Sequence, residues 1–331
     1  MVNDPFNSTV VELSRTALSG KPYTVSEVNH PYPNEWGSEG IPILAAYAGF
    51  QDWDGIFWYT FEPKLAPDWK AYVGDPFDIS LDPIKMPQLA AGALMFLRGD
   101  VSPARKTVER SYSREQVYDS VRLPRTERPY FTPGFPLETP LEHGSRISSL
   151  EGKPTAVFES VKADPIVSDT KELVWRLSPD KKGLVTIDTE RSQALIGYLN
   201  EQPKPLRNLA AAISNPFASI VLSSLDSKPI GKSSRLLLTA GVRVMNTGMK
   251  WNDTRTALAS WGGPPTLIEP VAGKVILQNL EGAAQVTIAP LDGAGRRLGE
   301  PRLANRTKQG WELEIGDPAS TWFEVAVKRP Q

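Results

Sequence analysis

The sequence predicts an α/β segment followed by an all-β region, and three observations support this fold class. Residues 21–62 alternate strand, loop, helix and strand, and both strands are continuously apolar. Strands of that kind are typical of parallel sheets that are buried on both faces. From about residue 156 the pattern changes to short alternating strands separated by turn residues. A charged, proline-rich stretch without sustained periodicity, residues 106–155, separates the two parts and is interpreted as a wrap or linker.

The α/β segment is expected to occupy residues 1–105. Asn7 or Ser8 can cap its first helix, and Gly20 can end it, because short polar residues satisfy free N–H groups and glycine tolerates the left-handed C-terminal position. The expected elements, in chain order, are a helix over 5–19, a strand over 22–26, a helix over 40–51, a strand over 55–61 and a helix over 84–97.

The all-β region is expected to form one or two β-sandwich modules, because many short strands at this spacing are typical of sandwiches. A break near Pro264–Pro265 suggests a larger module over 156–264 and a smaller one over 265–331. The expected strands are 155–160, 172–177, 183–188, 194–198, 219–224, 235–245, 274–278, 285–289, 311–315 and 322–327.

Composition excludes several classes of function. The chain has 331 residues, with 37 basic and 38 acidic side chains, so nothing in its charge favours nucleic acid or an anionic membrane as a partner. There is no cysteine, and the two histidines lack metal-ligand spacing, so neither a metal nor a cofactor is expected. No apolar run reaches the roughly 18–20 residues that span a bilayer. The first residues lack the pattern of a signal peptide, and the compartment stays open.

Two carboxylates, Glu27 and Glu62, follow the two apolar strands of the α/β segment. In α/β barrels, chemistry takes place where strands end and loops begin. Aromatic side chains near these ends can stack on sugar rings, and polar ones can bond hydroxyl groups. The candidate binding residues are Asn29, His30, Tyr32, Trp36, Trp58, Tyr59 and Glu62. The alternatives are a surface ion pair for Glu27, core packing for about half of the aromatic residues and a backbone-held ring for His30.

The stretch KPYTVSEVNHPYPNEWGSEGIPILAAYAGFQDWDGIFWYTFE, residues 21–62, resembles the last two βα units of retaining glycoside hydrolases with a (β/α)8 barrel. That clan includes β-galactosidases and cellulases. The resemblance covers roughly residues 5–105 and implies a partial barrel segment. It implies Glu27 as the catalytic nucleophile, Trp58 or Tyr59 as a sugar platform and an oligo- or polysaccharide as the substrate. Full-length relatives of this kind are secreted or periplasmic.

A retaining glycosidase also needs an acid/base carboxyl group roughly 5–5.5 Å from the nucleophile. In this clan it follows strand four, which this sequence lacks. Glu35 and Glu39 lie nearby, but a carboxylate at a helix start is favoured there by the helix dipole alone. The resemblance therefore implies that another chain completes the site. Because an incomplete parallel sheet exposes its edges, a homo-oligomer or a complementary barrel chain is expected.

Two other functions remain open from the sequence. One is a non-catalytic carbohydrate-binding or scaffold protein, in which the barrel-like segment only caps the sandwich. The other is an unrelated hydrolase that uses a carboxylate or a serine.

Overall fold

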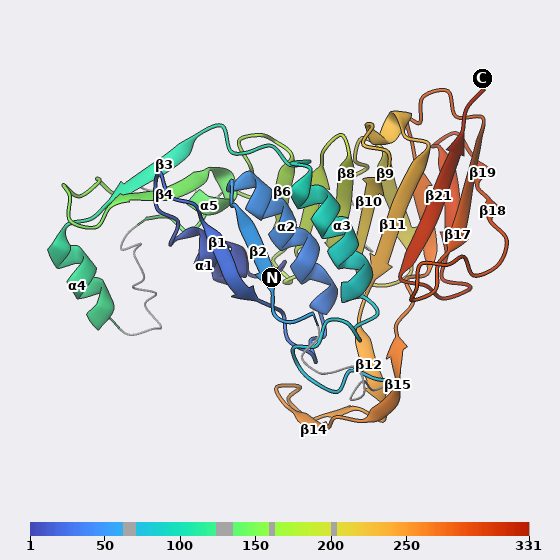
Figure 1. Cartoon of the computed structure of the whole chain (residues 1–331), viewed down its shortest axis with the longest axis horizontal. Helices are drawn as coiled ribbons and strands as arrows, with labels where there is room; N and C mark the ends of the chain where they lie inside the picture. The colour runs from blue at the N-terminus through green and yellow to red at the C-terminus, as the bar shows by residue number, and fades with distance from the viewer. Residues whose placement is uncertain (62–70, 124–134, 159–162, 200–203, 331) are drawn as a thin grey trace.

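The computed structural model describes residues 1–61, 71–123, 135–158, 163–199 and 204–330. Its main body is built around a nine-stranded sheet, with helices against one face and a four-stranded sheet against the other (Figure 1). A small arm of short strands extends from one edge of this body, and a separate parallel strand pair extends from one end.

The helices begin and end at recognisable signals. The Ser8 hydroxyl accepts a hydrogen bond from the Val11 N–H at 3.3 Å, so the predicted cap is present. The predicted helix over 5–19 is shorter in the structure, because residues 17–19 run alongside residue 147 with backbone hydrogen bonds of 2.8 Å. The helices are α1 (Thr9–Ser14), α2 (Gly40–Phe50), α3 (Lys85–Leu97), α4 (Arg114–Arg122) and α5 (Thr139–Glu142), with 3-10 turns at Pro5–Asn7, Gly37–Glu39 and Ile230–Lys232.

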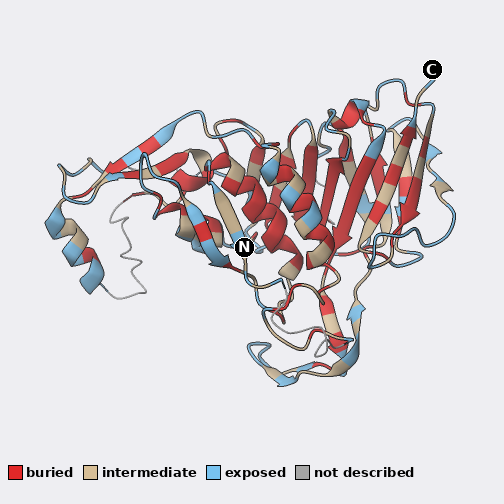
Figure 2. Cartoon of the chain, in the orientation of Figure 1, coloured by how far each residue is buried: buried red, intermediate tan, exposed pale blue. Residues whose placement is uncertain are grey.

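The two apolar strands of the α/β segment are β1 (Thr24–Val28) and β2 (Gly55–Trp58), and they pair in parallel. Helix α2 connects them, and it is buried almost all round (Figure 2) because it has no polar face to present to water. Strand β1 runs two residues further than expected. Glu27 therefore lies inside the strand rather than directly after it.

The nine-stranded sheet is antiparallel throughout. Its central strand β10 is buried along its whole length, because Val221 packs toward the helices while Ile220 and Leu222 pack toward the second sheet. In spatial order the strands are β18 (Arg302–Leu303), β17 (Gln285–Pro290), β21 (Trp322–Lys328), β11 (Arg235–Gly241), β10 (Phe217–Ser224), β8 (Ser192–Tyr198), β7 (Leu184–Asp188), β6 (Leu173–Arg176) and β5 (Ile166–Val167).

The four-stranded sheet covers the other face of the nine-stranded sheet. Val275, Leu277 and Leu313 point inward and are fully buried, whereas Lys274 and Glu314 point outward. This alternation is the period-two pattern of a sheet with one buried face. In spatial order the strands are β19 (Asn305–Arg306), β20 (Trp311–Ile315), β16 (Gly273–Leu277) and β9 (Leu209–Ile213).

The two predicted sandwich modules are not separate in the structure. Strand β21 pairs with β11, and β16 pairs with β9, so strands from 156–264 and from 265–331 share the same two sheets. Pro264–Pro265, expected at the boundary, lies inside a strand of the arm. The arm packs on Tyr32, Val73 and Ile84 and consists of β12 (Val244–Thr247), β13 (Lys250–Trp251), β14 (Leu258–Ser260) and β15 (Gly263–Ile268).

Residues 106–155, expected to be a wrap or linker, contain regular structure. Strands β3 (Thr107–Ser111) and β4 (Gly144–Ser149) pair in parallel, and Val108, Tyr112, Phe135 and Ile147 form a small core beside them. The strand expected over 155–160 is not formed by residues 155–158, and its last two residues lie outside the described residues.

The coarse fold class, an α/β part joined to an all-β part in a sheet-rich chain, is confirmed. The sheet formed by β1 and β2 has only these two strands among the described residues.

Candidate functional site

The predicted catalytic residue, Glu27, has an exposed side chain on β1. Because β1 and β2 are parallel and Val28 is level with Trp58, Glu27 lies beside the end of β2. No hydrogen bond or ion pair from its carboxylate to another described side chain is seen. Glu62, the other strand-end carboxylate, lies outside the described residues.

Asn29 connects the two strand ends. Its Nδ2 donates hydrogen bonds to the backbone oxygens of Tyr59 at 2.6 Å and of Phe77 at 3.0 Å, and its Oδ1 accepts one from Lys85 Nζ at 3.2 Å. Both the NH₂ group and the oxygen of the Asn29 amide are therefore engaged by the protein itself. The structure therefore places Asn29 as a support for the loop beyond β1.

Lys85, which the sequence analysis did not single out, is a buried cation at the start of α3. Its Nζ also donates to the backbone oxygen of His30 at 2.6 Å and lies 3.9 Å from Asp82 Oδ2. Burial lowers the pKa of Lys85, and the nearby Asp82 carboxylate opposes that shift. The sequence feature that could have identified Lys85 is its position as a lone charged residue at the start of a mostly apolar helical run.

His30 packs its ring against the backbone of Gly40. A Cβ added to Gly40 would lie 2.1 Å from His30 Nδ1, so only glycine fits at the start of α2. Thr9 Oγ1 is 3.4 Å from Nε2, while the buried Nδ1 has no hydrogen-bond partner among the described residues. Burial, followed by the charge of Lys85, lowers the pKa of His30 to about 4.

We expect the free energy of unfolding to depend on the protonation of His30. Above pH 6.5, the ordinary pKa, the ring is neutral in both states and the full stability is present. As the pH falls toward 4, the unfolded chain binds a proton that the folded chain does not, so stability decreases by about 3 kcal/mol. Urea unfolding between pH 7.5 and 4 measures this slope.

Two matched variants test the assignment. In His30→Gln the loss of stability between pH 6.5 and 4 should be smaller by this amount, and in His143→Gln the contribution of His30 should remain. His143 is a suitable control because its ring nitrogen pairs with Asp169 at 3.0 Å, away from His30. If the stability of wild type and of His30→Gln fell equally with pH, the lowered pKa of His30 would be contradicted.

Most of the predicted aromatic platforms take part in packing. Tyr32 is buried, accepting a hydrogen bond from the Asn246 N–H at 2.9 Å and lying edge-on to Trp261. The ring centroid of Trp36 lies 4.5 Å from that of Phe217, so the two rings pack together. Trp58 lies against the main core and is half-buried. Tyr59 is 43% exposed and is the predicted residue whose ring is most open to a ligand.

An apolar cleft lies beside the two-stranded sheet, between β2, α2 and α3. Its volume is about 320 Å³, and its walls include Ile41, Ile56 and Phe96. Two of its lining residues are strongly exposed, Phe57 at 62% and Leu97 at 80%. Exposed apolar side chains of this size around a cleft are typical of interaction surfaces.

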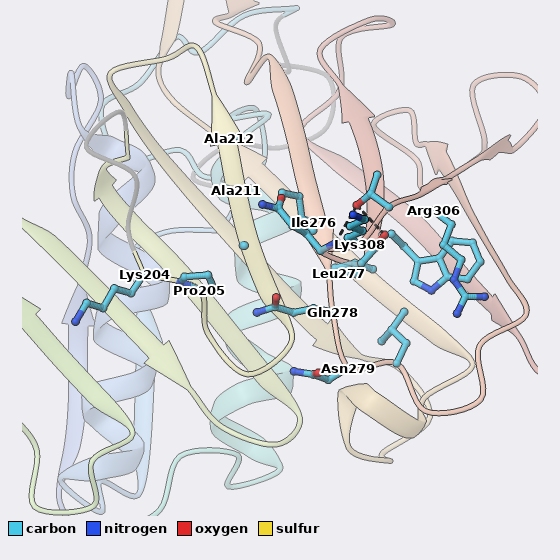
Figure 3. A pocket seen from close by; sticks show the side chains of 16 residues that line it. Lys204, Pro205, Ala211, Ala212, Ile276, Leu277, Gln278, Asn279, Arg306 and Lys308 are labelled. Atoms are coloured by element: carbon cyan, nitrogen blue, oxygen red, sulfur yellow. Dashed lines mark hydrogen bonds between the residues drawn. The ribbon is translucent and has the colours of Figure 1, made fainter.

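A larger hollow of about 900 Å³ lies on the outer face of the four-stranded sheet, at the ends of β9, β16 and β20 (Figure 3). Basic side chains and side-chain amides line it, and its floor consists of small apolar residues. The sequence analysis did not predict this site, because its residues come from three segments that are distant in the chain and carry no shared motif.

Within the described ranges, no group of three or more histidine, aspartate or glutamate side chains is arranged to hold a metal ion. None of the described helices combines the length and the apolar character needed to cross a bilayer.

Comparisons of the chain with protein-family models, with curated proteins and with solved structures found no match. The resemblance to glycoside hydrolases therefore stays a prediction from the sequence.

Proposed function

We propose that this chain is the closing segment of a retaining glycoside hydrolase, and that Glu27 becomes its nucleophile when further parallel strands extend the β1–β2 sheet. The observation that supports the proposal best is the parallel arrangement β1–α2–β2 followed by α3, with an exposed carboxylate on β1 and an exposed aromatic ring after β2. In α/β barrels, strand ends of this kind carry the catalytic residues.

The surface around β2 fits the proposed completion by another polypeptide. An outer strand edge presents unpaired N–H and C=O groups, which are a template for a further strand. The apolar cleft beside β2 and α3 would receive the side chains of that strand and of its helix, burying Phe57 and Leu97. The proposed partner is a complementary barrel chain, with a second copy of this chain as the alternative.

In the completed site, Glu27 would attack the anomeric carbon of the sugar and form a covalent glycosyl–enzyme bond as the glycosidic bond breaks. A carboxylic acid from the partner would donate its proton to the leaving oxygen. The same group, now a carboxylate, would take a proton from water, and that water would release the sugar with its configuration retained.

Glu27→Gln is expected to reduce aryl-glycoside turnover at least about a thousandfold, because an amide does not act as the nucleophile. The assay uses the chain alone over a wide range of concentrations, and also the chain co-expressed with any barrel-like polypeptide that an adjacent upstream reading frame encodes. A 2-deoxy-2-fluoro aryl glycoside, followed by mass spectrometry of peptides, should label Glu27.

Glu300→Gln, which changes an exposed carboxylate far along the chain, serves as the control and should retain full turnover. Equal rates for wild type and Glu27→Gln would remove Glu27 from the mechanism. Light scattering after size-exclusion chromatography checks assembly, and a chain that stays monomeric with every partner would contradict the completed site.

A second candidate function is carbohydrate binding without catalysis. The observation that favours it is the hollow on the four-stranded sheet, which lies in the all-β part of the chain, away from Glu27. A glycan array separates the two functions, since binding without turnover favours this one.

A further inference from the structure

The hollow on the four-stranded sheet has the size and shape of a ligand site. Its volume of about 900 Å³ is near the upper end of the range for ligand pockets, roughly 300–1,000 Å³. Ala210 and Ala212 of β9 and Ile276 of β16 form its floor. The two alanines leave the β9 side of the floor without projecting side chains. One wall comes from the chain before β9 and the other from the hairpin between β19 and β20 (Figure 3).

The charge of the hollow is one-sided. Lys204, Arg306 and Lys308 line it, and no acidic side chain among the described residues does. Among the described residues, none of these three cations has a carboxylate oxygen within 4.0 Å. The neighbouring outward-facing carboxylate, Glu312, is already paired with Lys274 at 2.8 Å. The hollow therefore offers positive charge that the described part of the chain does not neutralise.

Arg306 is held in position by an aromatic ring. Its guanidinium carbon lies 5.2 Å from the ring centroid of Trp311, within the distance of a cation–π contact. This contact restrains the long side chain while leaving its N–H groups open to a ligand. The contact therefore reduces the conformational entropy that Arg306 loses when a ligand binds.

Two side-chain amides in the hollow present acceptors rather than donors. Gln278 Nε2 donates to the Leu206 oxygen at 2.7 Å, and Asn279 Nδ2 donates to the Arg207 oxygen at 2.6 Å. These bonds direct the NH₂ groups toward the protein, and the two side-chain oxygens have no donor partner among the described residues. An amide oxygen binds a hydroxyl or another donor, and does not bind an anion.

The hollow thus combines cations for negative groups with acceptors for hydroxyl groups. Inorganic phosphate would use the first set and leave the second unused. An acidic peptide would find no pockets for its side chains on the alanine floor. An acidic sugar carries carboxylates, hydroxyls and the apolar C–H face of its ring, and these match the cations, the acceptors and the apolar floor of the hollow.

We propose that this hollow binds an acidic oligosaccharide, with its carboxylates at Lys204, Lys308 and Arg306 and its hydroxyls at Gln278 and Asn279. The site does not depend on Glu27 or on completion of the two-stranded sheet. It deepens the carbohydrate-binding function by assigning the ligand class.

The test is calorimetric titration of the full chain with a short galacturonate oligomer, and with a neutral galactose oligomer of equal length. Wild type should bind the galacturonate oligomer at least about tenfold more tightly than the neutral one, and binding should weaken with added salt. The double variant Lys204→Gln/Lys308→Gln should bind the acidic oligomer about tenfold more weakly, since it removes two exposed ion pairs with the ligand.

The control is Lys153→Gln/Lys250→Gln, which removes the same charge from exposed lysines elsewhere and should bind like wild type. Glu27→Gln should also bind like wild type, so this test stands apart from the catalytic proposal. Absence of binding, equal affinity for the neutral oligomer, or an unchanged double variant would each overturn the site. Equal or tighter binding of short polyglutamate would reassign it to acidic peptides.

Discussion

Trp175→Ala is expected to lower the free energy of unfolding by about 3–5 kcal/mol. Trp175 is fully buried on β6, where the helices meet the nine-stranded sheet. Its ring centroid lies 5.8 Å from that of Tyr47 on α2, and its Nε1–H donates to the Val2 oxygen at 2.9 Å. The substitution leaves a large cavity and an unpaired carbonyl group.

Urea unfolding followed by circular dichroism measures this effect. Trp175→Phe keeps most of the buried apolar area and loses the hydrogen bond, so it should cost only about 1–2 kcal/mol. A loss below about 1 kcal/mol for Trp175→Ala would mean that the helices and the sheet do not share this core.

Asp100→Ala is expected to cost about 2–4 kcal/mol, because it removes the buried carboxylate that two half-buried arginines and a serine hydroxyl contact. The Asp100 carboxylate is fully buried and lies 2.5 Å from Arg98 Nη2 and 2.9 Å from Arg191 Nε. It also accepts a hydrogen bond from Ser192 Oγ at 2.7 Å. These contacts connect the end of α3 to the start of β8.

Asp180→Ala is the matched control. Asp180 pairs with Lys182 at 3.0 Å, and both side chains are exposed. An exposed pair contributes at most about 1 kcal/mol, so this substitution should be nearly neutral in the same urea experiment. Similar losses for Asp100→Ala and Asp180→Ala would show that burial of the Asp100 network does not matter.

Local features of the fold were predictable from the sequence where burial alternates with a clear period. The expected strand over 311–315 coincides with β20, and the expected helix over 84–97 differs from α3 by one residue. The parallel relation of β1 and β2 is also as predicted, but the burial on both faces from which it was inferred is wrong, because three of the five residues of β1 are exposed. For β20 and α3 the signal is local, because the period of the apolar side chains is set by a single buried face.

The order of strands within the sheets could not be predicted, because pairing between distant segments leaves no periodic signal. The pairing of β11 with β21 joins residues that are about ninety positions apart, and proline pairs such as Pro264–Pro265 were misleading as boundary markers. Burial by distant segments likewise decides the environment of Tyr32, which packs with residues of the arm.

The candidate site near β1 was predicted by residue type, and the structure joins only part of it: Asn29 bonds to Tyr59, whereas Tyr32 packs with the arm. What the sequence could not indicate is how each is used: Asn29 supports the loop, and His30 packs against Gly40. The basic hollow was missed because no residue in it is unusual alone. Its positive charge and its acceptor groups come together only because the segments around Lys204, Gln278 and Lys308 meet at one end of the four-stranded sheet.

The position of β21 between β11 and β17 has a consequence for biosynthesis. Residues 322–328 lie between two strands that are synthesised before them, so β11 and β17 lack their shared partner until β21 has left the ribosome. Apolar strand edges are exposed throughout that interval, which favours self-association before the fold closes. A stop codon directly before residue 322 would therefore split the nine-stranded sheet and direct the product to chaperones and proteases.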